Sequence, residues 1–105
     1  MYSIDDFCSL NEPSKMVITQ HSRIRFAERG IEINDVCNAI SSGIIIEQYP
    51  EDYPFPSCLI LGNSNDKILH VVASINDSII YIVTAYIPSP EKWELDWKSR
   101  KGESK

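Results

Sequence analysis

Four side chains that could handle a phosphate group share one side of a helix predicted over residues 20–29. At about 100° per residue they form a stripe about 60° wide, with the last at its edge: His21, Arg25, Glu28 and Arg29. A histidine can transfer protons near neutral pH. Arginines can hold a phosphate with two parallel hydrogen bonds, and Glu28 could orient one of them. A solvated helix side with i,i+4 charge pairs explains the same spacing, so both interpretations stay open.

The predicted sheet offers a second polar set. Two neighbouring strands are expected over residues 68–75 and 79–87, joined by a turn at 76–78. In that register His70 lies opposite Thr84. The turn would therefore gather three polar side chains into one patch: His70, Thr84 and Tyr86. A strand histidine can equally be structural, and Thr and Tyr are ordinary strand formers.

The elements that must position these side chains change character at Gly43. Before it, Thr19 as N-cap and Gly30 as C-terminal glycine bracket the first long helix, with Ile24 and Ala27 on the face expected to pack on the sheet. A helical turn is also expected near residues 5–10 and a helix, capped by Asn34, at 35–42. After Gly43 the pattern favours four strands: 44–49, 57–61, 68–75 and 79–87.

The segment after the last strand carries helix-start signals. Ser89 is a cap, Pro90 suits the first helical position and Glu91 suits the first turn. Trp93 and Trp97 would lie one turn apart on this helix, as a packing stripe. We therefore expect a short C-terminal helix.

Short connections make neighbouring strands antiparallel, and strands segregated from helices are typical of an α+β fold. The fold class predicted is α+β, with N-terminal helices packed on a roughly four-stranded antiparallel sheet. A chain of 105 residues is expected to form a single domain over 1–105, with its core at about 16–97 and a flexible basic tail at 98–105.

Composition narrows the function classes. The net charge of −5 argues against nonspecific nucleic-acid binding, although arginines crowd the 20–29 helix. The three cysteines are scattered, as in a reduced cytoplasmic protein. The acidic start lacks the features of a signal peptide, and no membrane span is expected. Two histidines without Cys or carboxylate at ligand spacing predict no metal site, and no cofactor is expected.

The string from Thr19 to Ile31 resembles the opening "His, three residues, Arg, two residues, Glu-Arg-Gly-Ile" of the bacterial family called domain of unknown function 4258. The resemblance covers about residues 18–95. Further matching pieces follow in order: Gly43–Tyr49, Leu69–Val72, Thr84–Pro88 and Trp93.

This resemblance implies a fold like that of RelE-type and MqsR-type toxins, in the barnase–EndoU–colicin–RelE group of metal-independent ribonucleases. It implies a toxin that cleaves RNA by 2′-hydroxyl attack and is neutralised by an antitoxin, for which a zinc-ribbon protein with a helix-turn-helix domain is the candidate. His21 or His70 would then transfer protons, and Arg25 and Arg29 would hold the phosphate. Thr84 and Tyr86 would position the RNA. The acidic net charge departs from the basic character expected of an RNA-cleaving toxin. The alternative is a non-catalytic protein-binding or regulatory module on the same fold.

Overall fold

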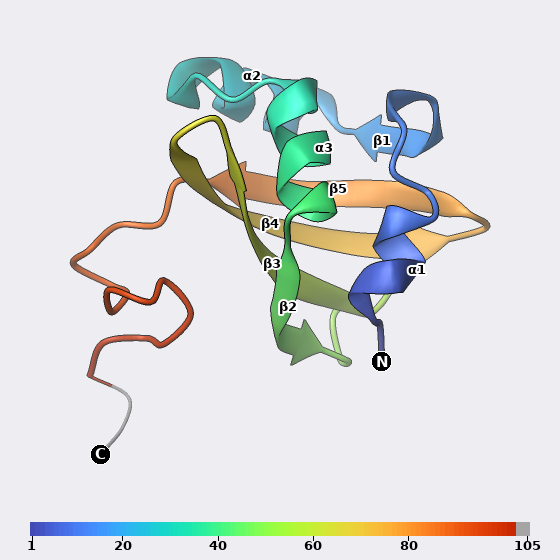
Figure 1. The fold of residues 1–105 in the computed structure, drawn as a ribbon. Helices are drawn as coiled ribbons and strands as arrows, with labels where there is room; N and C mark the ends of the chain where they lie inside the picture. Colours follow the sequence, from blue (N-terminus) through green and yellow to red (C-terminus); the bar gives the residue numbers. More distant parts are fainter. Residues whose placement is uncertain (103–105) are drawn as a thin grey trace.

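A mixed five-stranded sheet organises the computed structural model, which describes residues 1–102 (Figure 1). The strand order is β1-β5-β4-β3-β2. The helices are α1 (Ile4–Cys8), the short 3-10 helix η1 (Pro13–Lys15), α2 (Gln20–Arg29) and α3 (Ile33–Ser41). The strands are β1 (Met16–Ile18), β2 (Ile44–Tyr49), β3 (Ser57–Ser64), β4 (Lys67–Asn76) and β5 (Ile79–Tyr86). The predicted α+β class is confirmed.

The predicted four-stranded, wholly antiparallel RelE/barnase-like layout is wrong. A fifth strand, β1, joins the sheet parallel to β5, with Met16 opposite Ile80 and Ile18 opposite Ile82. The three residues of β1 are too short to give a strand pattern of their own. Their partner lies far along the chain, so local sequence could not indicate the pairing.

The turn between β4 and β5 is tighter than expected. Asp77 and Ser78 both have positive φ angles, 53° and 61°, and Asn76 pairs directly with Ile79. These features define a two-residue hairpin turn of the type whose twist matches the flanking strands. The predicted three-residue turn is therefore wrong by one residue.

A bulge then shifts the β4–β5 register once more. Ala73 lies opposite Ile82 and Val72 lies opposite Thr84, so Val83 is the extra residue. The predicted pairing of His70 with Thr84 is wrong as a result. His70 lies opposite Tyr86 instead.

The main core lies between one face of the sheet and the helices, where α3 crosses the strands (Figure 1). Phe7, Val36 and Ile40 meet the inward side chains of β3, β4 and β5. Fully burying a side chain of this size contributes roughly 1.5–3 kcal/mol. The approach of α3 is close: a Cβ added at Gly62 would lie 2.0 Å from the carbonyl oxygen of Ala39.

Local sequence signals predicted the bounds of α2 correctly but missed the start of α3. The bounds of α2 are those predicted, but the predicted packing face is wrong. Ser22 and Phe26 are buried, whereas Ile24 and Ala27 are exposed. The predicted cap of α3 at Asn34 is wrong. Glu32 is the cap and forms a capping box with Asp35, so α3 begins earlier.

The predicted C-terminal helix is absent from residues 87–102, which form turns instead. Trp97 has a positive φ of 62°, which no helix accommodates, and Trp93 forms an isolated bridge with Arg100. Tertiary contacts with the sheet override the local start signals of this segment. Residues 103–105, the end of the predicted tail, lie outside the described residues.

Candidate functional site

His70 lies at the centre of the sheet face opposite α3, fully buried. Its neighbours across the strands are Leu61 on β3 and Tyr86 on β5. The ring of Trp93 packs edge-on against the imidazole with centroids 4.4 Å apart, and the ring of Tyr86 does so at 5.3 Å. The segment after β5 therefore covers this histidine completely.

Both ring nitrogens of His70 are engaged. Nε2 lies 2.6 Å from the carbonyl oxygen of Trp97, which can only accept, so we assign the proton to Nε2. Nδ1 then accepts from the hydroxyl of Tyr86 at 3.2 Å. Burial lowers the pKa of His70 below its ordinary value, and Arg100 contributes in the same direction. The imidazole is thus neutral, partnered on both sides and closed to a substrate.

A charged clamp holds the covering segment in place. Arg100 donates to both carboxylate oxygens of Glu47, at 3.0 and 2.9 Å, and its guanidinium lies 4.6 Å from the ring centre of Trp93. The Tyr49 hydroxyl also donates to Glu47. The hydrogen bonds from Arg100 lower the pKa of Glu47, while burial raises the pKa of Tyr49. The C-terminal segment is therefore fixed at both His70 and β2.

Arg29 and Thr84, one from each predicted set, meet at the β5 edge. The Nη1 of Arg29 donates to the carbonyl oxygen of Ala85 at 2.8 Å and lies 3.5 Å from Oγ1 of Thr84. About two turns earlier on α2, Ser22 Oγ donates to the carbonyl oxygen of Val83 at 3.0 Å. The helix thus covers the β5 edge beyond the end of β1.

The rest of the α2 stripe points into solvent. His21, Arg25 and Glu28 are exposed, and their side chains make no hydrogen bond or ion pair within residues 1–102. Arg25 and Glu28, three residues apart on α2, form no ion pair among the described residues. Their assignment to a site stays a prediction.

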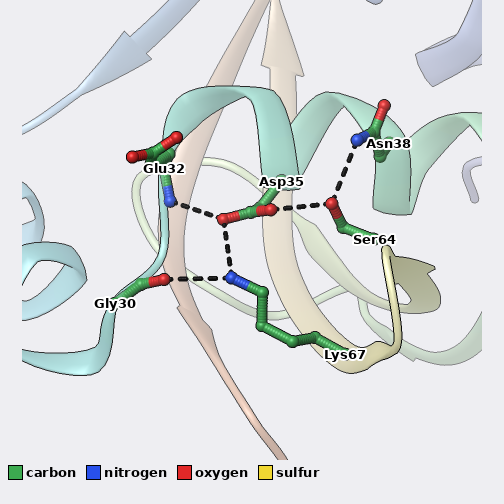
Figure 2. A network of polar contacts seen from close by, with 6 residues as sticks. All are labelled: Gly30, Glu32, Asp35, Asn38, Ser64 and Lys67. Atoms are coloured by element: carbon green, nitrogen blue, oxygen red, sulfur yellow. Dashed lines mark hydrogen bonds and ion pairs between the residues drawn. The ribbon is translucent and has the colours of Figure 1, made fainter.

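A polar network that was not predicted from the sequence surrounds Asp35 and includes Gly30, the residue after Arg29 (Figure 2). At its centre, Asp35 accepts from Ser64 Oγ at 2.7 Å and from Lys67 Nζ at 3.1 Å. Lys67 also donates to the carbonyl oxygen of Gly30 at 3.1 Å. Asn38 donates to Ser64 at 3.0 Å. The spacing of Glu32 and Asp35, three residues apart, was the one local signal.

This network positions the C-terminal end of α2. Burial alone would raise the pKa of Asp35, but hydrogen bonds from Glu32 N, Ser64 and Lys67 lower it below its ordinary value. The charged carboxylate therefore ties α3 to the β3–β4 hairpin. Through Lys67 it also fixes Gly30, the residue next to Arg29.

The stretch of sequence that forms α2, α3 and the strands β2 to β5 matches a known family. A family model described as domain of unknown function (DUF4258) matches residues 18–87. The chain belongs to this family. No curated protein and no solved structure matches it. The DUF4258 match includes α2, His70, Thr84 and Tyr86 but ends before the segment that covers His70.

Two further properties of this DUF4258 chain concern metals and membranes. Within residues 1–102, no three His, Cys, Asp or Glu side chains are grouped so that they could hold a metal ion. None of the helices among these residues is long and apolar enough to cross a bilayer. The three cysteines are all free.

Proposed function

We propose that this DUF4258 chain is the toxin of a bacterial toxin–antitoxin pair and cleaves RNA in the cytoplasm without a metal ion. The observation that carries the proposal is the exposed α2 stripe. His21 and Arg25 share that stripe with Arg29, and neither of the first two has a structural partner among the described residues. Exposed groups suited to proton transfer and phosphate binding, left unpaired on one helix side, fit a polyanionic substrate.

The chemistry assigned to the site is intramolecular transesterification. The RNA 2′-oxygen bonds to the adjacent phosphorus as its proton passes to His21. The bond to the 5′-oxygen breaks, and that oxygen takes a proton from water. Arg25 and the free donors of Arg29 stabilise the charge on the phosphoryl oxygens. Glu28, which is not paired with Arg25 in the described residues, would orient that arginine once RNA is bound. Thr84 lies beside Arg29 at the sheet edge, and Thr84 and Tyr86 would position the RNA.

The buried state of His70 supports His21 as the histidine that transfers protons. Proton transfer needs a group within hydrogen-bond reach of the substrate. His70 is fully buried and bonded at both nitrogens, whereas His21 is exposed. We therefore assign proton transfer to His21 and a supporting role to His70. The proposed partner is an antitoxin of the zinc-ribbon, helix-turn-helix type.

A second candidate function, a non-catalytic protein-binding module, has one specific observation in its favour. Ile24 is 52% exposed on α2, beside the charged stripe. An exposed isoleucine flanked by arginines suits a protein partner as well as it suits RNA. Under this alternative the same helix would bind a protein and cleave nothing.

Induced expression with matched variants tests the proposal. The wild-type chain should arrest growth, and the purified protein should truncate RNA in the presence of EDTA. His21→Ala should lose on the order of 100-fold or more in cleavage rate without a change in melting temperature. Arg25→Ala should also lose heavily, and Arg25→Lys should not restore the two-pronged geometry.

The control is Arg23→Ala, because Arg23 points about 160° away from Arg25 around the helix. It should retain toxicity and cleavage. Full activity in all four variants would refute the assignment of the α2 stripe as the catalytic site. A wild-type chain that neither arrests growth nor cuts RNA would instead favour the binding module, and loss of cleavage in EDTA restored by zinc or manganese would refute the metal-free mechanism.

A further inference from the structure

The two edges of the sheet are treated differently. At the β1/β5 edge, side chains from α2 satisfy the carbonyl oxygens of Val83 and Ala85. At the opposite edge, no hydrogen bond outside the β2–β3 ladder reaches the backbone of Ile44–Gln48 from anywhere in residues 1–102. Alternate residues of an edge strand direct N–H and C=O groups outward, so β2 presents a free row of both.

A groove runs beside this open edge. Its volume is about 390 Å³, and it is lined by Tyr2, Ser3 and Ile4 on one side and by residues 44–48 on the other. Ile44 is 48% exposed there, and β2 contains no lysine or proline that would guard the edge. The irregularity between Ile45 and Glu47 shifts the register with β3, and Arg100 pairs with the one charged residue of β2, Glu47. An extended chain could pair with β2 and place alternate side chains in the groove.

The charges around the groove select the occupant. The segments that line the groove and continue from it, residues 1–6 and 44–51, contain no lysine or arginine. Their acidic residues are Asp5, Asp6, Glu47 and Glu51. Arg100 neutralises Glu47, and the other three outnumber the single positive charge of the Met1 amino group. A second copy of the chain would bring the same acids face to face, and RNA would be repelled.

We propose that β2 accepts an extended, lysine- or arginine-rich segment of a partner protein as an additional strand. Main-chain hydrogen bonds supply the pairing, the groove takes the alternate apolar side chains, and the acidic surroundings select basic flanking residues. The surface lies on a different element from the α2 stripe. The proposal is therefore independent of RNA cleavage and goes beyond the proposed function.

Fluorescence anisotropy with labelled decapeptides tests this surface on the full-length protein. The probe alternates lysine with valine. Two matched peptides serve as comparisons, one with glutamate in place of lysine and one with a central proline. The lysine–valine peptide should bind, more weakly as salt rises, and both comparison peptides should fail. On binding, hydrogen exchange should slow at the amides of β2 and not at those of β5.

Matched variants place the contact on β2. Ile44→Lys adds a like charge at the groove and should weaken binding by on the order of tenfold. Ile87→Lys, at an isoleucine after β5 that is as exposed as Ile44, should bind like the wild type. The proposal is overturned if the lysine–valine peptide does not bind, if it binds Ile44→Lys unchanged, or if either comparison peptide binds equally well. A wild-type dimer in light scattering with β2 protected in the absence of peptide would also overturn it, in favour of a second copy.

Discussion

The Nε2 atom of His70 lies 2.6 Å from the carbonyl oxygen of Trp97, 27 residues further along the chain. This bond joins the centre of β4 to the segment that leaves β5. Burial lowers the pKa of His70 and so favours the neutral imidazole, in which Nε2 donates to this carbonyl and Nδ1 accepts from the Tyr86 hydroxyl. The covering of the outer sheet face therefore depends on the protonation state of one buried histidine.

Stability should fall as the pH drops below about 6.5, the ordinary pKa of histidine. Burial lowers the pKa of His70 in the folded state, so the unfolded chain binds that proton more tightly. The stabilisation is complete above the ordinary value and is lost as the pH falls through it toward the lowered pKa. Urea unfolding at a series of pH values between 5 and 8, the range in which histidines titrate, measures this change in the free energy of unfolding. Tryptophan fluorescence is a specific reporter, because both tryptophans lie in the covering segment.

The control is His70→Gln, which keeps an amide donor near Nε2 but does not titrate. It should lower stability overall and flatten the pH profile above pH 5. Glu47 and Asp35 do not contribute to the stability change in this pH range. Their pKa values are lowered, so their effects on the free energy of unfolding occur in more acidic solution. Parallel pH profiles for the wild type and the variant would contradict the assignment.

Local sequence signals predicted the features that depend on interactions between residues close together in the chain. The Thr19 side chain caps the start of α2, and Gly30 ends it with a positive φ angle, so these two residues gave its bounds. The bulge at Val83 and the pairing of β1 with β5 depend on partners far along the chain, so the register of His70 was out of reach. The C-terminal helix was wrong for the same reason: contacts of Trp93 and Trp97 with His70 outweigh the start signals at Ser89 and Pro90.

For the candidate site, the sequence reading found residues but not their burial. It grouped His70 with Tyr86, and the structure brings these two together. It could not indicate that Trp93 covers the pair, because that depends on how the chain returns after β5. It missed the network around Asp35, because Ser64 and Lys67 reach that carboxylate only once the β3–β4 hairpin packs on α3.

Asp35→Ala should destabilise the fold by about 2–4 kcal/mol. It removes the acceptor of Ser64 and of the Glu32 amide and leaves Lys67 without its ion pair. Asn34→Ala, one residue earlier on the exposed side of α3, should change stability by no more than about 0.5 kcal/mol. Chemical denaturation of both variants measures the difference. Equal effects would show that the network stabilises little and that Asn34 caps the helix after all.

Thiol labelling should separate the cysteines by burial. Cys8 is exposed, whereas Cys58 is fully buried and burial raises its pKa to about 12. A thiol reagent at pH 8 should therefore modify Cys8 at once and Cys58 only as the chain unfolds. Labelling followed by mass spectrometry at increasing urea gives the order. Modification of Cys58 in the native protein at the rate of Cys8 would contradict the packing of β3 against the helices.

Two substitutions of Arg29 should separate its role in covering the β5 edge from its proposed role in binding phosphate. Arg29→Ala removes the donor to the Ala85 carbonyl and should cost about 1 kcal/mol, because this side chain is exposed and the bond is partly screened by solvent. Arg29→Lys can still reach that carbonyl with its single ammonium group, but it cannot bind a phosphate with two prongs. The lysine variant should therefore recover the unfolding free energy and the hydrogen-exchange protection of β5 while remaining deficient in RNA cleavage. If lysine restores stability and cleavage together, Arg29 acts only through the sheet edge. If it restores neither, the guanidinium geometry is needed for covering β5 itself, and the separation of the two roles fails.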